Sequence, residues 1–367
     1  MTAQRETSET GLPGAAEAPG AAHGAGGSNG AEASPEGLDL VSKRTVLVSP
    51  VDALFRLHPG DRPLVTIGEA VGRGQPLLEH HRDPRTIVVP GLLGEDGVAA
   101  PGDRWEGTPG HRVREGDVQP GGELLFRSGN RWRIAGGDRP DTLEAPFAGV
   151  VHDVKPGTGV VVRAMTRAVL GRTVLAGPTW GRLHVATGPD GELRAQHVDV
   201  GAAGAIIVAG ARMDAEALTR ARAVGIRGVV VAALGVKEQR DFLASERRGR
   251  AAVHGLPPFA ILVLDGAARR PVASALMAIF EAAEGGMAAI VGDPPALVID
   301  DPNVPLPAPR PDVVRVRSGP LAGAEGVWAG LAGPRRFPAG VTLEAAFVRF
   351  GGRPPVAIPI GDLERFA

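Results

Sequence analysis

The chain has 367 residues, of which 43% are hydrophobic and 22% are charged, and its formal net charge is −1. These values are typical of a globular protein, and the length predicts two or three domains. The sequence contains no cysteine, which excludes disulfides, thiolate metal sites, cysteine-ligated iron–sulfur clusters and a cysteine nucleophile.

The charge is unevenly distributed, because residues 1–40 contain one Arg, five Glu and one Asp. The remaining chain is therefore weakly positive, which is too little to indicate binding to duplex nucleic acid from charge alone. No apolar run approaches the ~20 residues of a membrane helix, and the first ten residues lack the apolar core of a signal peptide. We therefore expect a cytoplasmic protein.

Residues 1–40 consist mainly of Ala, Gly, Glu, Ser and Pro, and Leu12, Leu38 and Leu40 are their large apolar side chains. Such a segment buries too little apolar surface to offset the entropy lost on ordering. The composition predicts a disordered tail over 1–40.

Short β-rich runs separated by Gly and Pro follow, at 45–48, 86–89, 123–126, 150–151 and 160–162. Strands this short and this frequently interrupted are typical of a small barrel or sandwich. We expect one β domain over residues 41–165.

Within this domain, residues 67–78 and 113–125 repeat a pattern of turn, valine, turn and Leu-Leu, and Glu144–Val151 follows the second copy. The region resembles the barrel-sandwich hybrid fold of biotinyl and lipoyl domains and of the N-terminal part of RnfC-type electron-transport subunits. Carrier domains of that family have a modifiable lysine at a hairpin tip, whereas Lys155, the only lysine nearby, lies in a part of the motif where the acceptor does not fall. The RnfC-like alternative lacks cysteines for its clusters. We therefore expect a scaffold domain with no cofactor.

The periodicity changes in residues 166–300, where a βαβ unit is expected. Gly204–Gly210 is typical of a buried strand, Asp214–Val224 of a helix and Gly228–Ala233 of a second strand, with Asp214 as N-cap and Gly225 as helix stop. A second cycle is expected from a helix at 237–244, a strand at 259–264, a helix opened by Pro271 and stopped by Gly285, and a strand at 288–291. These elements predict a parallel α/β domain. Residues 46–299 also loosely resemble uncharacterised bacterial and archaeal proteins that join a barrel-sandwich domain to an α/β domain.

A Pro-rich linker over 301–312 leads to a C-terminal segment, 313–367, that alternates at Val314 and Val316 and has a Gly-rich turn from Gly319 to Gly326. This segment resembles a KOW module, the SH3-like barrel at the C-terminus of the transcription factor NusG. The resemblance implies docking of RNA, the ribosome or the transcription machinery rather than chemistry.

Alternation divides this module into two faces. The partner-binding face is expected to hold Arg315, Arg317, Phe347, Arg349 and Arg353, and the core Val314, Val316, Val348, Phe350 and Val356.

Two loops are possible anion-binding sites in the α/β domain. The turn at Gly210 precedes a helix, and Arg269 and Arg270 follow Asp265 at the end of a strand, where open α/β sheets bind ligands. Both lack a nucleotide-binding fingerprint, so a structural turn remains the alternative. The histidines show no chelating spacing, since His80 and His81 would point to opposite faces of an extended chain, and no catalytic motif occurs.

The sequence thus predicts a multidomain α+β protein: a barrel-sandwich hybrid, a parallel α/β domain and a small SH3-like β-barrel. The favoured function is non-catalytic binding of a protein or RNA partner through the KOW-like module. The alternatives are a small-ligand sensor or enzyme using the α/β domain, and a structural assembly subunit.

Overall fold

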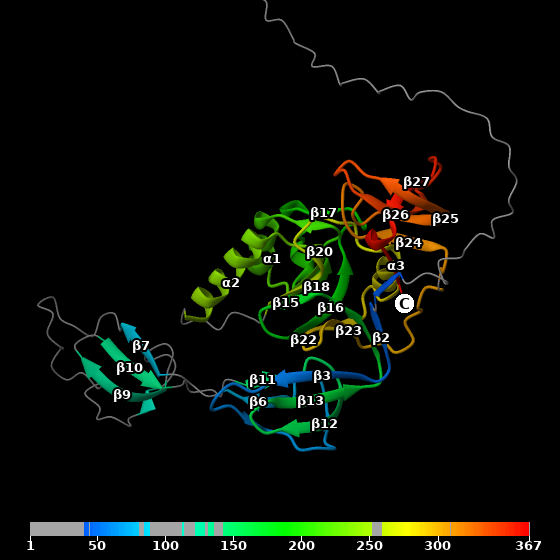
Figure 1. Cartoon of the computed structure of the whole chain (residues 1–367). Helices are drawn as coiled ribbons and strands as arrows, with labels where there is room; N and C mark the ends of the chain where they lie inside the picture. The colour runs from blue at the N-terminus through cyan, green and yellow to red at the C-terminus, as the bar shows by residue number, and fades with distance from the viewer. Residues whose placement is uncertain are drawn as a thin grey trace, which may run out of the picture.

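The computed structural model describes residues 40–43, 45–80, 84–88, 112–113, 122–128, 131–135, 142–251, 259–308 and 310–366. The described chain is mostly β-structure in several sheets, with three α-helices (Figure 1). This arrangement agrees with a multidomain α+β protein. Of the predicted disordered tail over 1–40, residues 1–39 lie outside the described residues. Leu40 is buried in the core of the C-terminal sheet, so the prediction is wrong for that residue.

A nine-stranded sheet forms the centre of the molecule. Its order is β15 (Thr173–Leu175), β21 (Ala260–Gly266), β20 (Gly228–Ala233), β18 (Ala205–Val208), β16 (Thr179–Val185), β22 (Met287–Gly292), β23 (Pro295–Ile299), β14 (Arg167–Leu170) and β2 (Val46–Val48). Within this sheet, β16, β18, β20 and β21 pair in parallel, and the other neighbours are antiparallel. The predicted parallel pairing therefore holds for β18, β20 and β21, whereas the strand expected at 288–291, β22, pairs antiparallel with both of its neighbours. The short connection between β22 and β23 leaves no room for a crossover and forces an antiparallel hairpin.

The predicted βαβ unit is confirmed by β18, helix α1 (Ala215–Val224) and β20. The Asp214 carboxylate accepts a hydrogen bond from the Ala217 amide at 2.5 Å, and Gly225 ends the helix with a φ of +86°. Both features are the local capping signals that the sequence shows.

Helices cover the parallel half of the sheet on both faces. Helix α3 (Ser274–Ala282) packs on one face, through buried residues that include Leu276 and Phe280. Helices α1 and α2 (Val236–Ala251) lie on the other face, where Phe242 joins the core. A two-stranded sheet of β17 (Glu192–Leu193) and β19 (Arg212–Met213) and two 3-10 turns, at Ala195–His197 and Val200–Ala202, complete this region.

Two small sheets form a sandwich beside the antiparallel half of the central sheet. One contains β3 (Val51–Arg56), β13 (Gly159–Ala164), β12 (Gly149–Lys155) and β5 (Ala70–Val71); the other contains β11 (Thr142–Glu144), β6 (Pro76–Glu79) and β4 (Arg62–Pro63). Their core includes Phe55, Leu77 and Phe147, and it is continuous with Val291 and Val298 of the central sheet. The sandwich thus packs against the central sheet and shares a hydrophobic core with it.

A separate sheet interrupts the sandwich sequence between β6 and β11. It has the order β7 (Pro84–Val88), β10 (Arg131–Ala135), β9 (Gly122–Ser128) and β8 (Arg112–Val113). The repeat expected at 113–125 lies largely outside the described residues.

The C-terminal sheet has six strands: β1 (Val41–Lys43), β28 (Leu363–Phe366), β24 (Val313–Val316), β25 (Glu325–Arg336), β26 (Thr342–Arg349) and β27 (Val356–Pro359). A 3-10 turn at Ile360–Asp362 precedes β28. Strand β1, expected in the first β domain, instead pairs in parallel with β28, and Leu40 enters the core of the C-terminal sheet. β2 likewise belongs to the central sheet.

The predicted core of this module is correct at Val314, Val316 and Val348, which are buried. Phe350 is half-buried, and Val356 is 42% exposed. Val356 begins β27, the edge strand of the sheet, so one side of it has no neighbouring strand in the described structure.

Candidate anion-binding site

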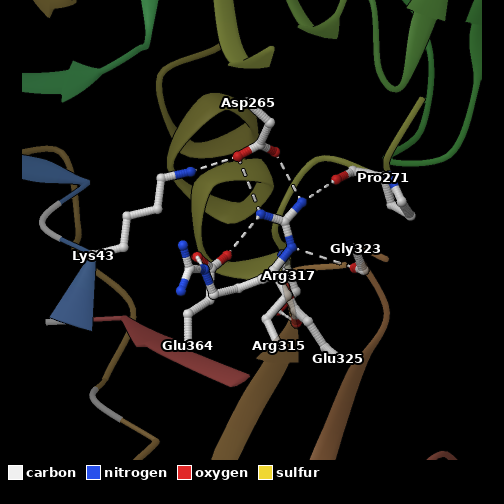
Figure 2. Close-up of polar contacts among 9 residues, drawn as sticks. Lys43, Asp265, Pro271, Arg315, Arg317, Gly323, Glu325 and Glu364 are labelled. Carbon is white, nitrogen blue, oxygen red and sulfur yellow. Dashed lines mark hydrogen bonds and ion pairs between the residues drawn. The ribbon is translucent and has the colours of Figure 1, made fainter. Parts of the chain in front are cut away.

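Arg315 lies between the C-terminal sheet and the α/β domain, and its side chain is 1% exposed. The prediction that Arg315 lies on an exposed face is therefore wrong. The alternation pattern correctly predicted that the Arg315 side chain points away from the core of its own sheet. The end of β21 and the loop after it cover that outer face (Figure 2).

The guanidinium of Arg315 contacts three separate segments of the chain. It donates to the Asp265 carboxylate at 2.8 and 3.2 Å, to the Pro271 carbonyl at 2.7 Å and to the Gly323 carbonyl at 3.3 Å. It also lies 3.4 Å from Glu364 of β28. The donors of a guanidinium have fixed directions, so Arg315 binds Asp265 of the α/β domain and Glu364 of the C-terminal sheet in one geometry. This holds the two domains in one orientation.

Asp265 is the shared anion of this cluster, because Lys43 from β1 also pairs with it. Burial alone would raise the pKa of Asp265, but the hydrogen bonds and charge of Arg315, together with Lys43, outweigh burial and lower the pKa. Burial would likewise lower the pKa of Arg315, and Asp265 and Glu364 instead raise it. Both groups are therefore charged at neutral pH.

A second contact joins the same domains. The Glu325 carboxylate of β25 accepts a hydrogen bond from the Ser274 amide at 2.9 Å and one from the Ser274 hydroxyl. Ala273, the N-cap residue of α3, provides no side-chain cap. The C-terminal sheet thus supplies the negative group that the amino end of α3 needs.

A pocket of about 440 Å³ opens beside this cluster. Its charged lining consists of four cations and three carboxylates: Lys43, Arg172, Arg270, Arg317, Asp265, Asp362 and Glu364. The carboxylates are already engaged, Asp265 and Glu364 by the cluster and Asp362 by the Ser318 hydroxyl. Among the described residues, no carboxylate forms an ion pair with Arg172 or Arg270. The lining therefore has one more cation than carboxylate, and its two arginines without a carboxylate partner are Arg172 and Arg270 among the described residues.

The pocket lies at the carboxyl end of a parallel strand. Asp265 is the penultimate residue of β21, and Gly266 has a φ of +129° and lies against the side chain of Arg172. Open α/β sheets bind ligands at this edge. The position, the size and the two unpaired arginines together suit a small anion such as a phosphate or a carboxylate.

A larger pocket of about 660 Å³ lies at the opposite edge of the sheet, near Arg182, Arg227 and Gly204. Helix α1 ends beside it at Gly225, whose carbonyl accepts a hydrogen bond from the Gly204 amide. Carboxyl ends of helices repel anions. The smaller pocket is therefore the better candidate for an anion, despite its size.

The predicted anion-binding residues do not gather at one place. Arg270 lines the pocket, whereas Arg269 points elsewhere and lies 3.4 Å from Asp190. Gly210 is buried in a turn with a φ of +60°, and a Cβ added there would lie 2.4 Å from the Gly188 carbonyl. The space beside Gly210 is filled by the chain itself, which supports the structural alternative for that turn.

The predicted partner-binding residues also separate. Arg317 lines the pocket, and Arg349 and Arg353 remain exposed. Phe347 is half-buried, with the Arg335 guanidinium 5.6 Å from its ring centroid. Sequence reasoning missed Lys43 and Arg172, because β1 pairs with a strand from the other end of the chain and no local signal shows this.

No protein-family model matches the sequence, and no curated protein sequence matches it significantly. Within the part of the chain that the structure describes, no helix has the length and apolar character needed to cross a membrane. Lys155 is exposed at the end of β12, 3.7 Å from Asp153. The absence of a covalent cofactor on Lys155 stays a prediction.

Proposed function

We propose that this chain is a non-catalytic binding protein that takes a small anionic ligand into the pocket between its α/β domain and its C-terminal sheet. The observation that supports the proposal is the pair Arg172 and Arg270, which line the pocket without a carboxylate partner in the described structure. A small anion with two or more oxygens would accept hydrogen bonds from both guanidiniums.

Binding of the ligand would also stabilise the docking of the α/β domain on the C-terminal sheet. The pocket walls come from β1, from the loops of the α/β domain and from the C-terminal sheet. A ligand that touches all three segments stabilises their association by its binding free energy, about 2.7 kcal/mol at a hundredfold excess over Kd. This coupling is what a ligand sensor requires.

Thermal unfolding with inorganic phosphate and with succinate tests the proposal. We expect at least one of these probes to raise the Tm of the wild type and to have little effect on the double variant Arg172→Gln and Arg270→Gln. Arg349→Gln is the matched control, since Arg349 is an exposed arginine away from the pocket. Absence of any shift with either probe, or an equal shift in the double variant, would contradict an anion site here.

The exposed face of the C-terminal sheet is the second candidate, and it keeps the partner class implied by the KOW resemblance. It is supported by the stacking of Arg335 on Phe347, with Arg349 exposed two residues further along β26 and Arg353 exposed in the turn that follows. Aromatic and guanidinium planes together bind single-stranded RNA. Here we expect RNA affinity that falls with salt concentration and is weakened by replacing Arg335, Arg349 and Arg353 with Ala, but not by replacing Arg172 and Arg270. A purely structural subunit would respond to neither probe.

A further inference from the structure

Two histidines and an aspartate from separate segments meet at one edge of the β-sandwich. His58 and Asp61 lie in the loop between β3 and β4, and His80 follows β6. The antiparallel pairing of β4 with β6 joins Arg62 to Glu79, and this register places Asp61 beside His80. The sequence gives no sign of the cluster, because its histidines are not close along the chain.

The donor atoms of these three residues converge. The Asp61 Oδ2 atom lies 2.9 Å from His80 Nδ1 and 3.4 Å from His58 Nδ1, and all three ligand atoms lie within 4.8 Å of one another. Ligands bound tetrahedrally at 2.0 to 2.1 Å are separated by about 3.3 Å. The two separations from Asp61 are therefore close to those of an occupied zinc site.

The loop geometry holds the carboxylate in place. Asp61 Oδ2 accepts a hydrogen bond from the His58 amide at 3.0 Å, and the Asp61 amide donates to the His58 carbonyl at 3.0 Å. The Asp61 side chain is 3% exposed, whereas those of His80 and His58 are 27% and 76% exposed. A buried carboxylate with increasingly exposed imidazoles leaves the outer side of the cluster open to water.

A neighbouring ion pair lies outside the cluster. Arg62 donates to Glu79 at 2.6 Å, so that pair is neutral and neither member belongs to the cluster. Two imidazole nitrogens and one carboxylate oxygen form a donor set that suits Zn²⁺ and other divalent first-row transition metals.

We propose that His58, Asp61 and His80 form a binding site for a divalent transition metal of the zinc class, with three protein ligands and an open position for water. This site is in the β-sandwich and does not depend on the anion pocket. Three protein ligands and a solvent position also occur in catalytic zinc centres, so a metal held here would keep a position for a bound water.

Titration of the full-length, chelator-treated protein with Zn²⁺ tests the proposal. Isothermal calorimetry of the wild type is expected to give one equivalent bound. His80→Ala and His58→Ala are expected to weaken this binding at least about a hundredfold, because loss of outer-shell partners alone costs about 10- to 100-fold. His184→Ala, which removes an exposed histidine paired with Glu284, is the control and should bind like the wild type.

Titration with Co²⁺ gives a second readout, since its visible spectrum reports directly on the ligands. Asp61→Asn should change this spectrum, and if that buried substitution prevents folding, His58→Ala still decides the matter because its side chain is largely exposed. Failure of the wild type to bind Zn²⁺ at micromolar concentration would overturn the proposal. Binding that is unchanged in both histidine variants would overturn it equally, and the contacts of Asp61 would then be hydrogen bonds alone.

Discussion

Arg315 shows how a surface pattern becomes an interior contact. It is 1% exposed and bonds Asp265 from a different domain, so both charges are removed from water together. A buried pair of this kind contributes little relative to an apolar pair, but removing one partner leaves an uncompensated buried charge. The role of Arg315 is therefore to fix which surfaces meet.

The first prediction concerns Arg315→Ala. It leaves Asp265 and Glu364 without their main donor, and we expect a loss of about 3 to 5 kcal/mol in the free energy of unfolding, measured with urea. The control Arg349→Ala removes an exposed arginine and should change the free energy by less than about 0.5 kcal/mol. Similar losses in the two variants would show that the buried contact is not important for stability.

The second prediction concerns pH. The folded-state pKa of Asp265 is lowered, so its stabilising contribution is fully present above the unfolded pKa, about 3.9, and is lost as the pH falls through the folded value. Arg315, whose pKa is raised, faces it and remains cationic throughout this range, and Lys43 faces it as well. The difference in unfolding free energy between wild type and Asp265→Asn should therefore be constant from pH 7 to about 5 and should narrow below about pH 4. A difference that is the same at pH 3 and pH 7 would contradict this linkage.

At the scale of elements, the turn between β24 and β25 brings the C-terminal sheet against the loop before α3. Gly323 has a φ of +88°, and a Cβ added there would lie 2.8 Å from Pro271 Cδ and 2.9 Å from Arg270 Cβ. Gly319, in the same turn, has a φ of +80°, but a Cβ added there would have no atom within 4 Å among the described residues. Both glycines therefore have a left-handed backbone, but a side chain at Gly323 would contact the α/β domain and one at Gly319 would not.

The third prediction uses this difference. Gly319→Ala should cost about 1 kcal/mol from its left-handed backbone alone. Gly323→Ala should cost about 1 to 3 kcal/mol more, because the added methyl separates the two domains. If chemical denaturation gave equal losses of unfolding free energy for the two variants, the turn would accommodate the methyl group without moving the interface.

Local signals predicted the elements better than their assembly. Asp214 and Gly225 delimit α1 through contacts within a few residues, so the sequence contains that information. The burial of Arg315 and the pairing of Lys43 with Asp265 depend on segments that are distant in the chain. Alternation distinguishes two faces of a strand, but it does not say which face another domain covers. The same limit hides the convergence of His58 with His80.

At the scale of the whole molecule, the helices and the sandwich pack on the central sheet. Its parallel half is covered by helices on both faces, and the sandwich packs on its antiparallel half. The C-terminal sheet is attached differently, through polar contacts at Arg315 and Glu325 and through strand β1. Attachment by β1 makes that sheet dependent on residues far from it in sequence.

The fourth prediction tests this dependence with two truncations. Removal of residues 1–39 should leave the Tm unchanged within error, since their composition offers little apolar surface for packing. Removal of residues 1–43 also deletes Leu40 from the core, strand β1 and the Lys43 pair, and the Tm should fall by several degrees. A fall of the same size in the shorter truncation would show instead that the tail itself packs.

The pairing of Val41 with Glu364 and of Lys43 with Phe366 also sets the order of events during synthesis. β1 cannot pair until β28 has left the ribosome, because β28 is the strand with which it forms its hydrogen bonds. The central sheet and the sandwich can form before β28 is synthesised, whereas the C-terminal sheet and the anion pocket are completed only after it. A ligand for that pocket would therefore meet only chains in which β28 has already been made.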